Sequence, residues 1–210
     1  MATLHVDGDG FSVLVEGETV KALGPYEELA DALPQALGSA RAGETPLQAR
    51  VRRWPGILTP GLLNPYGPEI LEHTYHPDPR EADTYGTVPI GGERAREIFR
   101  ADPSRLGASA RRGVQRLFAH GTVALAGELR SKAVLEVARR SGLAFGGRPA
   151  RLPGPVSLSP KPMVLLPALT VGGAARFAVF DVADRAELVA KGASTCVATV
   201  VAGRLVYRAR

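Results

Sequence analysis

The segment of residues 68–83 gathers most of the side chains of this 210-residue chain that could do chemistry, including two of its four histidines. If Pro68 opens a helix at its first position, which proline tolerates, the side chains that fall at i, i+3, i+4 and i+7 and share one face are Glu69, Glu72, His73 and His76. Carboxylates and imidazoles arranged in this way can bind a divalent metal, which would activate a water while a carboxylate moves the proton. The candidate metal ligands are His73, His76, Glu69 and Asp78, the metal would be zinc, iron or manganese, and the candidate acid–base residues are Glu72 and Asp83.

The same spacing also fits an ordinary amphipathic helix. Ile70, Leu71, Thr74 and Tyr75 would then face the core, and the acidic stripe would face water. Both interpretations assume that one continuous helix runs from Pro68 to His76.

Other residues that could do chemistry have structural alternatives. His120 precedes Gly121-Thr122 and is expected to end a helix, where a cation offsets the helix dipole; it is also a candidate binding residue. His5 lies in an expected strand, and Cys196, the only cysteine, lies in a run of β-forming residues, so both are expected to be structural. The motifs of serine hydrolases, Walker-loop proteins, zincin metalloproteases and dinucleotide-binding proteins are absent from the sequence.

Helical and strand patterns place these residues along the chain. Val114, Leu117 and Phe118 recur at helical spacing, and TVALA at residues 122–126 is typical of a short buried strand. A Pro/Gly-rich stretch at residues 146–162 would return the chain to β-structure. The expected helices are residues 25–33, 94–100, 109–120 and 129–140, and the other expected strands lie within residues 3–23, 49–54 and 56–63.

Residues 60–68, Pro-Gly-Leu-Leu-Asn-Pro-Tyr-Gly-Pro, resemble the first barrel strand of the amidohydrolase superfamily. In that family the pattern is Pro-Gly, two apolar residues, Asp or Asn, and then His-x-His, whose histidines bind the catalytic metal. Tyr66 and Pro68 occupy the two histidine positions here. Proline offers no lone pair, and a neutral tyrosine is a poor substitute for imidazole, so the usual metal centre is lost. Asn64 and Tyr66 are therefore candidate binding residues.

Both ends of the chain carry the same resemblance. Residues 175–181 and 193–207 are similar to the family's closing strands, and Gly24-Pro25 with Glu28-Leu29 is similar to the exit of its first β-segment. Within the family, the pattern resembles imidazolonepropionase-like and aminodeoxyfutalosine-deaminase-like proteins. The resemblance implies a mixed α/β fold. A composite β-sandwich domain would comprise residues 1–56 and 160–210, and residues 57–159 would form a truncated barrel of about three strand–helix units, since a complete barrel needs about 250 residues.

Composition and charge limit the partners. The net charge is +5, but the basic residues are scattered and do not alternate with aromatic ones, so nucleic-acid binding is not predicted. The sequence has neither an apolar run long enough to span a membrane nor a leader pattern, which favours a cytoplasmic protein. Three barrel strands cannot close on themselves, and we therefore expect a homodimer through the open side of the barrel.

Three functions remain open from the sequence. The first is a pseudoenzyme of the amidohydrolase type that needs no cofactor and acts by binding a partner protein or a small ligand. The second is an active metal-dependent hydrolase or deaminase on a C–N bond. The third is a structural assembly subunit. The rebuilt site of the second would use Glu72, His73, His76, Asp83 and His120.

Overall fold

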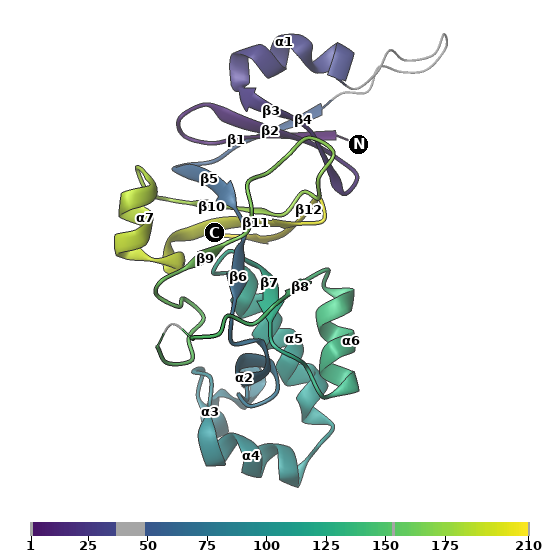
Figure 1. The fold of residues 1–210 in the computed structure, drawn as a ribbon. Coiled ribbons are helices and arrows are strands. Elements are labelled where there is room, and N and C mark those ends of the chain that lie inside the picture. The colour runs from purple at the N-terminus through teal and green to yellow at the C-terminus, as the bar shows by residue number, and fades with distance from the viewer. Residues whose placement is uncertain (1, 37–48, 153, 210) are drawn as a thin grey trace, which may run out of the picture.

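The chain folds into a mixed α/β structure with three four-stranded sheets, seen in a computed structural model that describes residues 2–36, 49–152 and 154–209 (Figure 1). Figure 1 shows α1 and the first sheet at one end, the second sheet in the middle, and the third sheet with helices α2 to α6 at the other end. The helices are α1 Tyr26–Ala36, α2 Gly67–Leu71, α3 Ala82–Tyr85, α4 Gly92–Ala101, α5 Arg105–Phe118, α6 Lys132–Arg140 and α7 Arg185–Lys191, with short 3₁₀ turns at Pro79–Glu81 and Ala193–Thr195.

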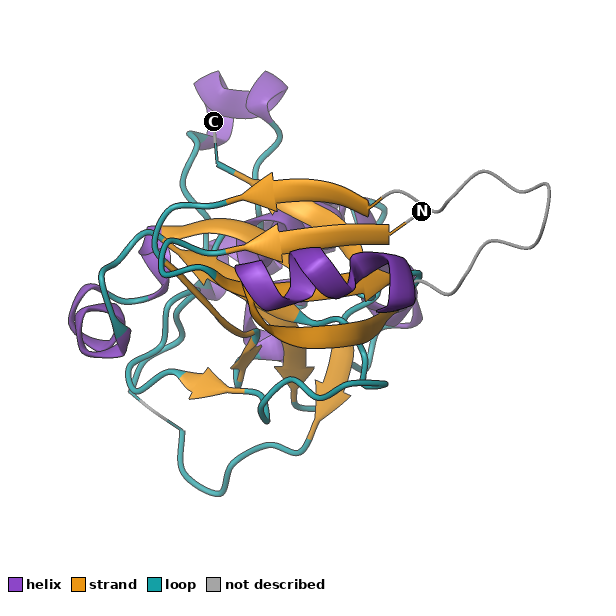
Figure 2. Ribbon diagram, turned by 90° about the horizontal axis from the view of Figure 1, so that it is seen from above, coloured by secondary structure: helices purple, strands orange, loops and turns teal. Residues whose placement is uncertain are grey.

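The amino-terminal sheet has the order β3-β2-β1-β4, and α1 lies across one of its faces (Figure 2). The β2–β1 and β2–β3 pairs are antiparallel, whereas β4 runs parallel to β1. Ala2, Leu4 and Val6 of β1 and Leu14 of β2 form a small core with Leu29 of α1. The strands are β1 Ala2–Val6, β2 Phe11–Glu16, β3 Thr19–Pro25 and β4 Ala49–Arg53.

The middle sheet has the order β12-β11-β10-β5 and is antiparallel throughout. It joins distant parts of the chain, because Ile57–Pro60 pairs with Phe177–Phe180. Phe177 and Val200 pack against Val13 and Val15 of the amino-terminal sheet. The strands are β5 Ile57–Pro60, β10 Phe177–Phe180, β11 Cys196–Val201 and β12 Arg204–Arg208.

The third sheet, which we call the parallel sheet, has the order β8-β7-β6-β9. β6, β7 and β8 are parallel, and β9 runs antiparallel to β6 at the edge. Val123 and Leu125 of β7 are fully buried in the largest core, together with Val114 and Leu117 of α5 and Val134 of α6. The strands are β6 Leu62–Asn64, β7 Thr122–Ala126, β8 Ala144–Gly146 and β9 Val164–Leu165.

The strand expected over residues 56–63 is wrong as a single element. It is divided at Gly61 into β5, in the middle sheet, and β6, in the parallel sheet. Gly61 donates its N–H to the carbonyl of Arg176, and its carbonyl accepts the N–H of Leu166. Its backbone is therefore hydrogen-bonded to two neighbouring segments. A Cβ at Gly61 would lie 2.3 Å from a methyl of Val123, which explains why glycine stands at this position.

Most other predicted elements are confirmed within a few residues. α1, α4, α5, α6, β4 and β7 lie where the patterns placed them, although α6 begins at Lys132 because Ser131 accepts the N–H of Val134 and caps it. The division of the chain into a composite β-domain and a barrel segment stays a prediction. No helix among the described residues is long and apolar enough to cross a membrane.

Candidate functional site

The single helix face expected across Pro68 to His76 does not exist. α2 starts with Pro68 in its first turn, as expected, but it ends at Leu71. Tyr75 then exchanges two backbone hydrogen bonds with Ile90, both 2.8 Å long, and this bridge holds the chain in an extended form that a helix cannot adopt. The prediction that Glu69, Glu72, His73 and His76 share one face is therefore wrong.

The carboxylates of this segment have partners elsewhere in the fold. Glu69 makes an ion pair with Arg148, and Glu72 accepts the backbone N–H of Ser131 at 2.6 Å. Because Ser131 is the residue that caps α6, its bond to Glu72 stabilises the start of that helix. His73 and Asp83 are exposed.

Asp78 and Glu81 form a reciprocal cap around the 3₁₀ turn at Pro79–Glu81. Asp78 accepts the N–H of Arg80 at 3.0 Å, and the N–H of Asp78 donates to Glu81 at 3.2 Å. Asp78 also lies 3.3 Å from a guanidinium nitrogen of Arg112 on α5. Its carboxylate is thus used to hold the segment against α5.

His76 is buried, with 1% of its surface exposed. Its Nε2 lies 2.8 Å from the carbonyl oxygen of Ile70, and because that oxygen only accepts, Nε2 carries the proton. Nδ1 is then an acceptor, and it is buried without a partner among the residues that the structure describes. Burial lowers the pKa of His76 to about 4, with a further lowering by Arg116 and Arg112, so the ring is neutral at pH 7.

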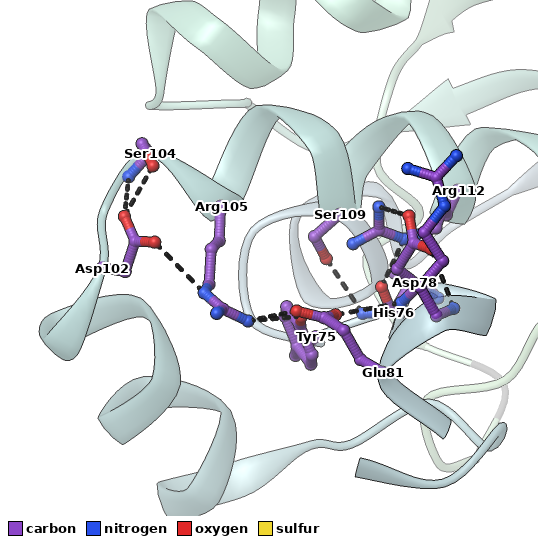
Figure 3. A network of polar contacts seen from close by, with 10 residues as sticks. Tyr75, His76, Asp78, Glu81, Asp102, Ser104, Arg105, Ser109 and Arg112 are labelled. Atoms are coloured by element: carbon purple, nitrogen blue, oxygen red, sulfur yellow. Dashed lines mark hydrogen bonds and ion pairs between the residues drawn. The ribbon is translucent and has the colours of Figure 1, made fainter. Parts of the chain in front are cut away.

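A polar cluster around Tyr75 fixes the same segment to α5 (Figure 3). The hydroxyl of Tyr75 donates to Glu81 at 2.5 Å, and Arg105 donates to Glu81 at 2.6 Å and to the Tyr75 oxygen at 3.1 Å. Asp102 binds the other side of Arg105 at 3.2 Å. Burial and the bond to Glu81 raise the pKa of Tyr75, while the Tyr75 hydroxyl holds the pKa of Glu81 below its usual value.

Sequence reasoning missed this cluster. Arg105 and Arg112 are seven residues apart on α5 and therefore lie on one helix face. Arg105 binds the Tyr75–Glu81 pair, and Arg112 donates from Nε to the carbonyl of His76 at 2.6 Å. The seven-residue spacing of two arginines beside an acidic segment is a signal that could have indicated it. The cluster holds the segment in place, and its charges are paired internally.

Asn64 and Tyr66 lie at the carboxyl end of β6, and both are 1% exposed. Asn64 donates from Nδ2 to the carbonyl of Ser157 at 3.0 Å, and its Oδ1 accepts the N–H of Tyr66 at 2.9 Å. The Tyr66 hydroxyl donates to the carbonyl of Gly154 at 2.5 Å. We call residues 154–158 the cover segment, because their carbonyls accept the hydrogen bonds that the Asn64 and Tyr66 side chains donate.

The residues at the strand end do not fit a metal ion. The phenol of Tyr66 is neutral and already donates to the cover segment, and Pro68 has no donor atom to offer a metal. Within residues 2–36, 49–152 and 154–209, no three His, Cys, Asp or Glu side chains form a group that could hold a metal. A divalent metal bound by His73, His76, Glu69 or Asp78 stays a prediction.

The other singled-out residues have internal contacts. His120 follows α5, and its Nδ1 lies 2.8 Å from the carbonyl of Arg116, so it caps the last turn of that helix. His5 accepts the indole N–H of Trp54 at 3.2 Å, and burial lowers the pKa of His5 to about 4. Cys196 is buried and has its pKa raised to about 11 by burial, which makes it an unreactive thiol at neutral pH.

Three hollows lie near these residues, and one of about 340 Å³ is lined by Tyr75, Glu81 and Arg105 of the polar cluster. A cavity of about 270 Å³ is lined by His76, Thr74, Ile70 and three residues of the cover segment. A larger groove of about 490 Å³ lies between α5 and α6. None of these hollows could be predicted from the sequence, since each depends on how separate elements pack.

No family model matches the chain, and no curated protein is similar to it. Among solved structures, N-isopropylammelide isopropylaminohydrolase from Burkholderia multivorans is 18% identical with a TM-score of 0.39, over 69% of this chain and 36% of that one. Guanine deaminase from Bradyrhizobium japonicum is 19% identical with a TM-score of 0.38, over 64% and 27%. Ochratoxinase from A. niger is 15% identical with a TM-score of 0.36, over 70% and 30%.

The chain thus spans about a third of the length of each of these structures. The identities and TM-scores are low, so these likenesses by themselves establish neither a family nor an activity for this chain.

Proposed function

We propose that this chain is an amidohydrolase-like pseudoenzyme that acts by binding a partner protein or a small ligand, without a metal cofactor. In this proposal β6, β7 and β8 correspond to the first three strands of a barrel, and the two other sheets correspond to a composite β-sandwich. The observation that carries the proposal is the cover segment. Asn64 and Tyr66, at the positions where the family pattern has its metal-binding end, both donate to carbonyls of residues 154–158.

The energetics favour a structural role for these two side chains. Ser157 and Gly154 offer carbonyls that receive the side chains of Asn64 and Tyr66, and a buried polar group that loses its partner costs about 1–3 kcal/mol. A substrate that approached the strand end would have to displace the cover segment and replace these bonds. The strand end is therefore better suited to holding the fold together than to chemistry.

The competing function, a metal-dependent hydrolase or deaminase with a rebuilt site, draws on one observation. The Nδ1 atom of His76 is a neutral acceptor with no partner in the described part of the chain, and its side chain lines a cavity. Its other nitrogen is committed to Ile70, and the nearby carboxylate of Asp78 is paired with Arg112. One imidazole with these neighbours lacks the second ligand and the free acid–base carboxylate that such a reaction needs.

Elemental mass spectrometry on untagged protein tests this choice. We expect much less than one zinc, iron or manganese per chain, and no turnover of C–N hydrolase substrates when each metal is supplied. The exposed His73→Ala and the buried His76→Gln variants are measured beside the wild type, with the buried His5→Gln, outside the proposed site, as the matched control and circular dichroism as the check on folding. About one metal per chain that is lost in the His73 or His76 variant, together with hydrolysis, would establish the enzyme instead.

Homodimerisation and a purely structural role in an assembly remain proposals beside this one. β8 and β9 are the edge strands of the parallel sheet, and open edges favour association with another chain. Light scattering at micromolar concentration tests the dimer, and a monomer mass of 22.1 kDa would exclude it. A cytoplasmic location is also a proposal.

A further inference from the structure

The groove between α5 and α6 is formed by two matching stripes of side chains. The residues from α5 recur at i, i+4, i+7 and i+8, and those from α6 and the residue after it recur at i, i+3, i+4, i+7 and i+8, so each set is one face of its helix. We call this surface the arginine groove. Its main lining residues are Gly107, Arg111, Val114 and Gln115 from α5, and Ala133, Glu136, Val137, Arg140 and Ser141 from α6 and its cap, with Arg112 at one side.

The two helices hold the net charge of the chain. Together α5 and α6 contain seven lysines and arginines and one acidic residue, Glu136, which leaves a surplus of six positive charges. The whole chain has a net charge of +5. The remaining residues are therefore close to neutral in sum, but Arg105 and Arg112 are paired with Glu81, Asp102 and Asp78 outside the two helices. The exposed positive charge that lines the groove comes from Arg111 and Arg140.

The arginines of the groove keep donors for a ligand. Arg111 is exposed and makes no side-chain hydrogen bond or ion pair within the part of the chain that the structure describes. Arg140 uses only Nε, on Glu136 at 2.7 Å, and that pair is exposed to water. Arg112 uses Nε on His76 and one terminal nitrogen on Asp78. Each guanidinium has five N–H donors, so several remain available to carboxylates.

The floor of the groove is apolar. Val114 is buried at its base, Val137 is half-buried, and Ala133 is exposed beside them. Gly107 has no side chain, and nothing lies within 4 Å of where a Cβ would be, so the groove stays open at that end. A positive rim around an apolar floor is complementary to an amphipathic ligand with acidic side chains at its edges.

The size and the residue types favour a peptide over a nucleic acid. α6 has nine residues and is therefore about 13 Å long, which matches two to three turns of a partner helix. Phe118 is the only aromatic residue of α5 and α6, and it is 2% exposed, so no ring is available to stack on a base. Apolar side chains of a helix could contact Val114 and Val137, whereas a sugar–phosphate backbone could not use them.

We propose that the arginine groove is the docking surface for an acidic amphipathic segment of a partner protein. This inference rests on the proposed binding function and names its surface and the chemistry of its partner. Leucine-like side chains of the segment lie on Val114 and Val137, and its carboxylates pair with Arg111, Arg112 and Arg140.

A fluorescein-labelled helical peptide of about 14 residues, with leucines on one face and glutamates on the other, tests the proposal by fluorescence anisotropy. We expect saturable binding with Kd of about 0.1 mM or lower, weakened at least about tenfold by Arg111→Glu/Arg140→Glu and by Val137→Asp. The matched control is Arg94→Glu/Arg204→Glu, which changes the net charge equally at exposed sites outside the groove and should alter Kd by less than about twofold.

Two further peptides and an oligonucleotide complete the test. Replacing the leucines by serines, or the glutamates by lysines, should abolish binding. Equal losses in the groove variant and the control variant would show attraction to net charge alone and overturn the proposal, as would undiminished binding of the serine peptide or no binding by the wild type. A single-stranded oligonucleotide that binds more tightly than the peptide and depends on Arg111 and Arg140 would replace it with nucleic-acid binding.

The failure of this inference and that of the proposed function are distinguishable. If the protein is metal-free and inactive and does not bind the peptide, only the docking proposal for the arginine groove is overturned. Stoichiometric metal with hydrolysis removes the pseudoenzyme proposal, whatever the peptide does.

Discussion

The strand end beneath the cover segment and the arginine groove belong to the same sheet-and-helix region, but their polar groups are used differently. At the strand end, Asn64 and Tyr66 are buried and bound to carbonyls of the chain itself. In the groove, Arg111 and Arg140 are exposed and retain donors. The difference teaches that the buried polar side chains at the strand end are used up by the fold, whereas the exposed arginines on the neighbouring helices keep donors for a ligand.

Acid should destabilise the protein through its two buried histidines, His76 and His5. His76 has a pKa of about 4 in the folded protein against a usual value of 6.5, so between these values the unfolded chain binds more protons and unfolding becomes easier as pH falls. The free energy of unfolding should drop by about 3 kcal/mol from His76 between pH 6.5 and 4, and by a similar amount from His5, whose folded pKa is also about 4.

Urea denaturation across this pH range measures the loss. His76→Gln should remove about half of the pH dependence, and the exposed His73→Gln serves as the matched control. A His76→Gln variant with the full wild-type slope would mean that this buried ring does not titrate as described, and the strand end would then differ less from the groove.

Asn64→Ala should destabilise the fold by about 3 kcal/mol. The change removes the donor to the Ser157 carbonyl and leaves the buried N–H of Tyr66 without its acceptor. Val156→Ala is the control, because that exposed side chain lies in the cover segment and Asn64 does not bind it. Chemical denaturation gives both values, and equal small losses would contradict a structural role for Asn64.

Tyr66→Phe should cost about 1–2 kcal/mol, since only the hydroxyl bond to Gly154 is lost and the ring stays in the core. Hydrogen exchange of residues 154–158 should become faster, while that of β7 should change only with global stability. Unchanged exchange in the cover segment would mean that Tyr66 does not hold it.

Arg111→Glu/Arg140→Glu should change the free energy of unfolding by less than about 1 kcal/mol, because Arg140–Glu136, the only ion pair affected among the described residues, is exposed. Thermal melting followed by circular dichroism measures it. A loss as large as that of Asn64→Ala would show that the groove arginines are structural too, and would remove the contrast between the two regions.

Local patterns in the sequence predicted the helices of this region well. Val114, Leu117 and Phe118 recur at helical spacing and are all buried in the core beneath α5. The short strand over residues 122–126 is also confirmed as β7. These elements follow from contacts between neighbours along the chain, where periodicity is informative.

Contacts between distant residues explain what the sequence could not predict. The end of α2 at Leu71 follows from the pairing of Tyr75 with Ile90, and the placement of Asn64 follows from carbonyls more than 90 residues away. The polar cluster around Tyr75, which the sequence did not indicate, has the same origin, because Arg105 lies 30 residues from Tyr75 along the chain. The candidate ligands were chosen from one assumed helix face, and they separated when that helix proved short.

The pairing of β5 with β10 has a consequence for how the molecule forms. Pro60 lies opposite Phe177, so everything between them, including the parallel sheet and its helices, is topologically the connection of one hairpin. Closing so long a loop carries a large entropic cost, and pairing between strands so far apart in sequence is slow. We therefore expect the parallel sheet and its helices to fold first and to bring the two strands together, which would make the middle sheet the last part of the protein to be completed.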